Sequence, residues 1–179
     1  MSHRALPRAL ALWTISASVA SAQTPGPLPP WITQDEGART VLLTLEATAA
    51  ADGGSGLLDG HHHGDIQIVV PLGWTVRWSW RNADSTQPHS LVLMVEREKL
   101  PTEGGRPAFD NAMSRMVTQG LRPGQRDETT FTAEEAGWYW LLCGVPGHAL
   151  KGEWLGLKVD REAKRVGVVV RPAAGRSPP

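Results

Sequence analysis

Residues 75–82 (TVRWSWRN) alternate strictly between apolar and polar side chains. Val76, Trp78 and Trp80 fall on one face, and two arginines and a serine fall on the other. This two-residue period is that of a β-strand with one buried face, whereas an amphipathic helix repeats every 3.6 residues. A sheet that buries two tryptophans on one face needs a second layer to cover them.

Other segments of similar length read as strands, and glycine- and proline-rich turns separate them. Many short strands with almost no helical pattern predict an all-β sandwich or barrel. Residues 99–119 differ from the rest, because they contain glycines and prolines followed by FDNAMSRMV, which suggests one or two helical turns. We therefore expect one long, partly helical insertion between strands. The predicted strands are residues 41–48, 65–71, 75–82, 90–96, 127–132, 138–143 and 154–159, with a further one at 165–171.

The first 22 residues have the features of a secretory signal peptide. A short basic start precedes an apolar run at 9–20, and Ala20-Ser21-Ala22 is a small-x-small cleavage signal. The apolar run is shorter than the ~20 residues that span a membrane. We expect cleavage after Ala22, export to the periplasm or beyond, and no stable membrane insertion afterwards. The expected organisation is a signal peptide at 1–22, a proline-rich leader at 23–37, one domain at 38–172 and a flexible tail at 173–179.

Charge and cysteine content narrow the function further. The chain has 18 basic and 18 acidic residues, and the predicted signal carries two of the arginines and no acid. The exported chain is therefore slightly acidic, which argues against a nucleic-acid partner. The single cysteine, Cys143, cannot form an internal disulfide, so it is either buried and inert or used in chemistry.

Three residues around that cysteine suggest a metal site. Cys143 ends an apolar strand, and His148 follows it within a glycine- and proline-rich loop. His89 precedes the predicted strand at 90–96 and shares the parity of Leu91 and Leu93, so it should point inward. One cysteine with two histidines and a weak axial group is the ligand set of an electron-transfer copper site. The alternatives are that His89 is an ordinary core histidine, and that the loop holds a buried inert cysteine with an exposed histidine that happens to be close.

Glu153 lies five residues after His148 and shares the parity of Leu155 and Leu157, so it should also point inward. A buried carboxylate is costly unless it has a cationic partner or a proton. Three outcomes remain open: a metal ion, a basic side chain such as Lys151, or a turn that breaks the parity and leaves Glu153 in water.

Several stretches together resemble the cupredoxins, and most closely the sulfocyanin-type blue copper proteins. The main ones are residues 88–90 (PHS), 136–139 (AGWY) and 143–149 (CGVPGHA). Residues 70–76 (VPLGWTV) and 107–109 (PAF) are similar to that family too.

The resemblance extends over residues 65–159 and has specific implications. It implies a Greek-key β-sandwich with one copper ion that cycles between Cu(I) and Cu(II). It implies His89, Cys143 and His148 as copper ligands. It also implies electron transfer on the exported side of the membrane, often toward respiratory oxidases.

The chain departs from the family pattern at one position. Residues 152–154 read Gly-Glu-Trp, whereas the family has Gly-Met-Trp. Glu153 therefore stands where the axial methionine is expected, and it is the candidate fourth ligand. Met94, Met113 and Met116 could supply a thioether, but no motif places them at the site.

Two functions follow from these patterns. The first is an exported, monomeric carrier of single electrons. Its redox partner, such as a cytochrome or a terminal oxidase, would dock on small apolar residues around His148. The alternative is a periplasmic copper-handling protein, a chaperone or resistance factor, that uses the run His61-His62-His63 and has little redox cycling. The docking residues are Gly144, Val145, Pro146, Ala149 and Leu150.

An enzymatic function is not expected. A copper oxidase or nitrite reductase needs a second copper site, and the chain has six histidines, of which His3 lies in the predicted signal. A thiolate-bridged binuclear centre needs two cysteines. No nucleophile, base and acid grouping for hydrolysis is evident.

Overall fold

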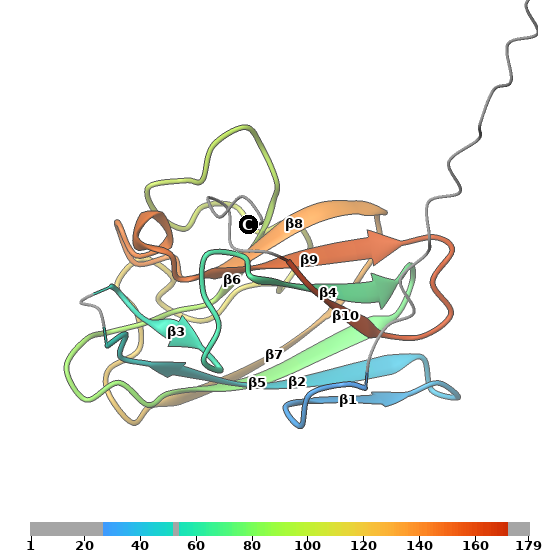
Figure 1. The fold of residues 1–179 in the computed structure, drawn as a ribbon, viewed down its shortest axis with the longest axis horizontal. Coiled ribbons are helices and arrows are strands. Elements are labelled where there is room, and N and C mark those ends of the chain that lie inside the picture. The colour runs from blue at the N-terminus through green and yellow to red at the C-terminus, as the bar shows by residue number, and fades with distance from the viewer. Residues whose placement is uncertain (1–26, 52–53, 172–179) are drawn as a thin grey trace, which may run out of the picture.

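The computed structural model describes residues 27–51 and 54–171, and the strands form two sheets packed face to face (Figure 1). The first sheet contains β1 (Ile32–Asp35), β2 (Thr40–Thr48), β3 (Leu57–Leu58), β5 (Thr75–Asn82) and β7 (Arg126–Thr132). The second sheet contains β4 (Ile66–Pro71), β6 (Val92–Val95), β8 (Gly137–Leu142), β9 (Trp154–Asp160) and β10 (Gly167–Val170).

The chain crosses repeatedly from one sheet to the other between β3 and β8. The first sheet has the order β1-β2-β5-β7, with β3 paired to β2, and the second has the order β10-β4-β9-β8-β6. The pairs β2–β5 and β4–β9 are parallel, and the other named pairs are antiparallel. This is the all-β sandwich of the cupredoxin type that the sequence predicted.

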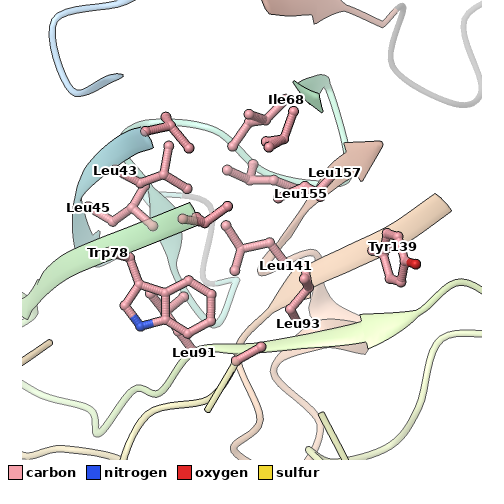
Figure 2. Close-up of a cluster of buried hydrophobic side chains, with 14 of the residues drawn as sticks. Leu43, Leu45, Ile68, Trp78, Leu91, Leu93, Tyr139, Leu141, Leu155 and Leu157 are labelled. Carbon is pink, nitrogen blue, oxygen red and sulfur yellow. The ribbon is translucent and has the colours of Figure 1, made fainter. Parts of the chain in front are cut away.

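The core lies between the two sheets and follows from the alternation in β5. Trp78 and Trp80 are fully buried, and the ring of Trp78 contacts Phe131 edge-on at 5.2 Å between centroids. Figure 2 shows Leu43 and Leu45 of β2 pointing toward Leu155 and Leu157 of β9, and the ring of Trp78 lying beside Leu91. Each large apolar side chain buried in this way contributes roughly 1.5–3 kcal/mol. The core therefore fixes β8 and β9, the two strands that flank the candidate site.

Two strands lie where the sequence predicted none. β1 falls inside the segment assigned to the proline-rich leader, and it pairs with β2 in antiparallel register from Ile32 to Asp35. β3 falls between the predicted strands at 41–48 and 65–71. The predicted signal peptide and most of the predicted tail lie outside the described residues.

The expected helix within the insertion is wrong. Residues 109–117 form turns, and the one helix in the described parts of the chain is the 3-10 turn η1 (Ala149–Lys151). The reason is that the insertion bonds to the edge of the second sheet beside β6. Leu93 accepts a hydrogen bond from Ala108 N–H and donates one to the carbonyl of Ala112, and Ser114 N–H donates to Leu91. These backbone bonds replace the i to i+4 bonds of a helix.

No helix among the described residues is long and apolar enough to cross a membrane. The outer face of the second sheet carries a smaller apolar cluster beneath the insertion. It contains Val92, Trp140, Leu142 and Ala149.

Candidate metal centre

The loop between β8 and β9 is closed tightly by its own backbone. Cys143 N–H donates to the carbonyl of Glu153 at 3.0 Å, and Glu153 N–H donates to the carbonyl of His148 at 3.2 Å. Gly147 and Gly152 have φ angles of 82° and 107°, which L-residues with a side chain rarely adopt. The loop thus brings a thiol, an imidazole and a carboxylate together from residues five apart.

His89 reaches the same place from the segment before β6. Its backbone pairs with Leu121, donating a hydrogen bond at 3.2 Å and accepting one at 2.7 Å. The side chain is fully buried, as its shared parity with Leu91 and Leu93 predicted.

The four residues proposed from the sequence lie in one cluster. Each of His89, Cys143, His148 and Glu153 offers one ligand atom, and these atoms all lie within 4.8 Å of one another. Cys143 Sγ lies 3.6 Å from Nδ1 of His148, and that nitrogen lies 3.1 Å from Glu153 Oε2. His148 is 7% exposed and the other three are sealed from solvent. A metal ion at the centre would therefore be almost completely shielded from water.

The surroundings of Glu153 decide between the three outcomes that the sequence left open for its carboxylate. Its side chain is fully buried, so the expectation of a solvated turn is wrong. Lys151 is exposed and forms no ion pair, so the expectation of a lysine partner is wrong too. The neighbours of the carboxylate are the imidazoles of His89 and His148.

Two buried atoms in the cluster lack a hydrogen-bond partner. His89 Nδ1 and Glu153 Oε1 are 2.8 Å apart, but the approach is not aligned as a hydrogen bond, so both atoms remain unsatisfied. Leaving such groups unpaired costs ~1–3 kcal/mol each. A cation bound between them would satisfy both. A thiolate, two imidazoles and a carboxylate form a donor set that suits copper, so these residues fit a copper ion.

Protonation in the metal-free cluster follows from burial and charge. Burial raises the pKa of the Cys143 thiol, and the charge of Glu153 adds to that effect. Burial also raises the pKa of Glu153, but the hydrogen bond with His148 and the nearby imidazoles of His89 and His148 outweigh it and lower that pKa overall. Burial lowers the pKa of His89, and Glu153 and Asp84 more than reverse the effect. Metal binding must therefore displace the thiol proton.

Asp84 contacts the ring nitrogen of His89 that faces away from the cluster, and no role was predicted for it from the sequence. Its Oδ2 lies 3.2 Å from Nε2 of His89, which leaves Nδ1 facing the cluster. Burial raises the pKa of Asp84, but hydrogen bonds from Thr86, His89 and Gln87 outweigh it and hold the pKa at about 2. A carboxylate on the second nitrogen orients a metal-binding imidazole and makes it a stronger donor. An acid five residues before a candidate histidine was the available signal.

Ser90 organises the thiol. Its N–H donates to Cys143 Sγ at 3.4 Å, and its hydroxyl accepts from Gly144 N–H at 2.8 Å while donating to the carbonyl of Val117 at 2.6 Å. Hydrogen bonding to the sulfur stabilises negative charge there and modulates the properties of a copper–thiolate site.

The loop at residues 54–56 covers the side of the cluster where Glu153 lies. Ser55 Oγ donates to the carbonyl of His148 at 2.8 Å. A Cβ added to Gly56 would lie 2.7 Å from His89 Cε1 and 3.0 Å from Glu153 Cδ. Only glycine fits there without moving a ligand. No role in the metal centre was predicted for this segment from the sequence.

The other candidate ligands are not brought into a site. Nδ1 of His61 lies 3.2 Å from Asp65 Oδ2, and the rings of His62 and His63 contact each other at a tilt, 4.8 Å between centroids. Within residues 27–51 and 54–171, the cluster at Cys143 is the one group of three or more histidine, cysteine or acidic residues that could hold a metal. The methionines are also elsewhere: Met94 and Met113 pack in the outer apolar cluster, and Met116 is exposed.

Comparison with known proteins agrees with this geometry. The sulfocyanin (SoxE) domain model matches residues 30–166. Sulfocyanin of Sulfolobus acidocaldarius is 28% identical over 124 residues, which cover 65% of this chain and 61% of that protein. The match thus spans less than two thirds of the relative's length.

Two solved structures are among those that the chain matches. Auracyanin from Roseiflexus castenholzii is 23% identical with a TM-score of 0.45, covering 65% of this chain and 96% of its own. Rusticyanin from Thiobacillus ferrooxidans is 25% identical with a TM-score of 0.43, covering 68% and 82%. The family of the chain is assigned from the sulfocyanin domain model, because that model matches most of the chain. The chain therefore belongs to the sulfocyanin (SoxE) domain family of cupredoxin copper proteins.

Proposed function

We propose that this protein is an exported, monomeric, mononuclear copper protein that carries single electrons, with Glu153 as the fourth copper ligand in place of a methionine. The observation that carries the proposal is the buried cluster of four donor atoms within 4.8 Å, two of which are unsatisfied without a cation. Bound copper would supply one-electron cycling between Cu(I) and Cu(II), the general chemistry of the family.

The protein's part in this chemistry is to hold the donors rigidly and exclude water. His89 is fixed by Asp84 and Leu121, and Cys143 is fixed by Ser90. Because these contacts do not depend on the metal's charge, the ligand positions can stay the same in both oxidation states. Electron transfer then requires little rearrangement.

Glu153 sets the expected redox properties. A carboxylate is a harder and stronger donor than a thioether, and its negative charge favours the oxidised ion. The proposal therefore includes a lower reduction potential than that of a methionine-ligated relative. A stronger fourth ligand also weakens the copper–thiolate bond, which moves the colour of the protein from blue toward green or red as the main absorption band moves to shorter wavelength.

The surface around His148 supports docking of a redox partner such as a cytochrome or a terminal oxidase. His148 is the least buried of the four donors, and Pro146 and Leu150 beside it are exposed. Leu150 is 55% exposed, which is high for a leucine, and exposed apolar patches are commonly interaction sites. We place this docking outside the cytoplasm, because residues 1–22 read as a secretory signal.

The test is an absorption spectrum of the purified chain loaded with copper(II), recorded before and after a mild reductant. A strong visible band that bleaches on reduction and returns on oxidation is expected for a redox-active Cys143 site. The Cys143→Ser variant is the matched control, because it keeps the other three donors but cannot give a thiolate band. Bound copper without a visible band would contradict the electron-carrier proposal and favour copper handling.

A further inference from the structure

A hollow of about 310 Å³ lies on the outer face of the second sheet, between β6 and the start of the insertion. Trp140 of β8 and Met94 of β6 contribute apolar surface to it, and Trp140 is 6% exposed. The side chains of Arg97, Lys99 and Arg106 surround this apolar surface.

These three cations have no acidic partner in the described parts of the chain. None of them forms an ion pair, and no carboxylate lines the hollow. The exposed acids nearest in sequence, Glu96, Glu98 and Glu103, are not among the lining residues. Elsewhere in the described parts of the chain, four cations form ion pairs, Arg77–Glu128, Arg81–Glu46, Arg115–Asp127 and Lys158–Asp160, and the other eight lysines and arginines form none. The lining of the hollow therefore carries three positive charges and no negative one over an apolar base.

An exposed aromatic side chain extends the surface along β8. Trp138 lies two residues before Trp140 on the same face of the strand and is 46% exposed. Lys158 Nζ and Arg171 Cζ lie 5.2 Å and 5.3 Å from its ring centroid, and Glu96 lines the shallow surface beside it. Tryptophan, arginine and methionine are the residue types enriched where proteins bind one another.

We propose that this aromatic–basic face, formed by Trp138, Trp140, Arg97, Lys99 and Arg106, binds an acidic segment of a redox protein partner. Carboxylates of the partner would pair with the three cations, and one apolar side chain would enter the hollow above Trp140. The inference rests on the proposed function as an electron carrier, because it assigns a second partner surface to that carrier. A concave hollow with a nearly buried tryptophan fits an inserted side chain better than a flat lipid surface.

The position of Trp140 links this face to the metal centre. It lies on β8 three residues before Cys143, which directly follows the end of that strand, or about 10 Å at ~3.3 Å per residue. A partner bound here would approach the thiolate side of the cluster, whereas a partner at Leu150 would approach His148. Separate faces would let the protein contact its electron donor and its electron acceptor through different surfaces.

The first experiment measures binding of a synthetic peptide in which glutamates and aspartates flank one leucine. NMR spectra of the copper(I) form at low salt would report both affinity and location. The test variant is R97E/R106E. The control is R161E/R165E, which changes the charge by the same amount on two exposed side chains. These residues follow the C-terminal end of β9, whereas Glu153 precedes its start. We expect shifts at residues 94–108 and 138–140, and an affinity that falls at least about tenfold in the test variant only.

An equal loss of peptide affinity in the two double variants would overturn the proposal, because binding would then depend only on net charge. Chemical shift changes located elsewhere would overturn it too, because the peptide would bind another surface. Sedimentation with phosphatidylserine vesicles is a second arm. If R97E/R106E abolishes vesicle binding but leaves peptide binding intact, the face belongs to a membrane surface and the proposal is wrong.

A kinetic measurement keeps the test separate from the proposed function. Reoxidation of the copper(I) protein by anionic ferricyanide should slow at least about fivefold in R97E/R106E compared with R161E/R165E, because attraction to this face is lost. Reoxidation by cationic cobalt tris(phenanthroline) should not slow. Equal ferricyanide rates in the two variants would contradict the proposed electron-transfer role of the face. Failure of the electron-carrier proposal itself would appear differently, as the absence of any band that bleaches.

Discussion

Glu153 directs one carboxylate oxygen at Nδ1 of His89, 2.8 Å away, at full burial and without the alignment of a hydrogen bond. The two groups attract each other electrostatically, but each of these atoms has lost its water without gaining an aligned hydrogen bond. A cation that binds both atoms would satisfy them. The contact is therefore the feature of this structure that most clearly favours a four-donor metal centre.

Replacing Glu153 by methionine should raise the reduction potential of the copper site by roughly 60 mV or more, equivalent to a tenfold change in the relative affinity for the two oxidation states. The physical reason is the loss of a negative charge that favours Cu(II). The main visible band should also move to longer wavelength, so that the colour of the protein becomes bluer. A redox titration followed by absorption measures both, with the exposed Glu135→Gln as control. An unchanged potential and spectrum would remove Glu153 from the ligand set.

Asp84→Asn should weaken copper binding by about 10–100-fold while leaving the four donors in place. An amide at this position lacks the charge that orients and strengthens His89 through Nε2. Competition with a chelator of known affinity measures the loss, and the exposed Asp110→Asn serves as the matched control. Equal affinity for wild type and Asp84→Asn would show that Asp84 only caps its own turn.

Gly56→Ala should disturb the metal centre from outside the ligand set. The added Cβ would lie 2.7 Å from His89 Cε1 and 3.0 Å from Glu153 Cδ, so at least one of these side chains must move. We expect a changed copper spectrum and a stability loss of ~1–3 kcal/mol. Gly37→Ala is the control, because its nearest neighbour would lie 3.4 Å away at ordinary contact distance. Copper electron paramagnetic resonance and urea unfolding would compare the variants, and matching spectra would contradict the positioning role.

Asp59, which is not one of the four donors, should make the stability of the fold depend on pH. Burial raises the pKa of Asp59 to about 6, although the hydrogen bond from Glu46 N–H opposes the shift. A raised folded-state pKa means that its stabilising contribution is fully present below the unfolded value near 3.8 and is lost as the pH rises through about 6.

Asp59→Asn should therefore be more stable than wild type at pH 8, with the difference vanishing below pH ~4. Asparagine tolerates the positive φ of 50° at this position and keeps an acceptor for Glu46 N–H. Thermal unfolding of both proteins across this pH range measures the effect. A pH-independent difference would show that the Asp59 carboxyl is not responsible.

Much of the architecture could be predicted because strand periodicity is a local property. The alternation of residues 75–82 gave β5 and its buried tryptophans, and parity placed His89 and Glu153 inward. The cluster at Cys143 could be proposed because its loop places three of the donors within eleven residues of chain.

What could not be predicted depends on contacts between distant segments. Residues 109–117 have a helix-like composition, but backbone bonds to β6 decide their conformation. β1 was missed because its four residues follow a proline-rich stretch and gain order only by pairing with β2. Asp84 and Gly56 look like ordinary loop residues until the fold places one behind His89 and the other against Glu153.

The most direct test of the central claim is a crystal structure of the copper-loaded protein with anomalous scattering measured at the copper edge. We expect one anomalous peak, which marks a copper ion bound by Cys143 Sγ, by Nδ1 of His89 and of His148, and by a carboxylate oxygen of Glu153. A peak at the His61–His63 run instead, or a Glu153 carboxylate turned away from the copper, would contradict it.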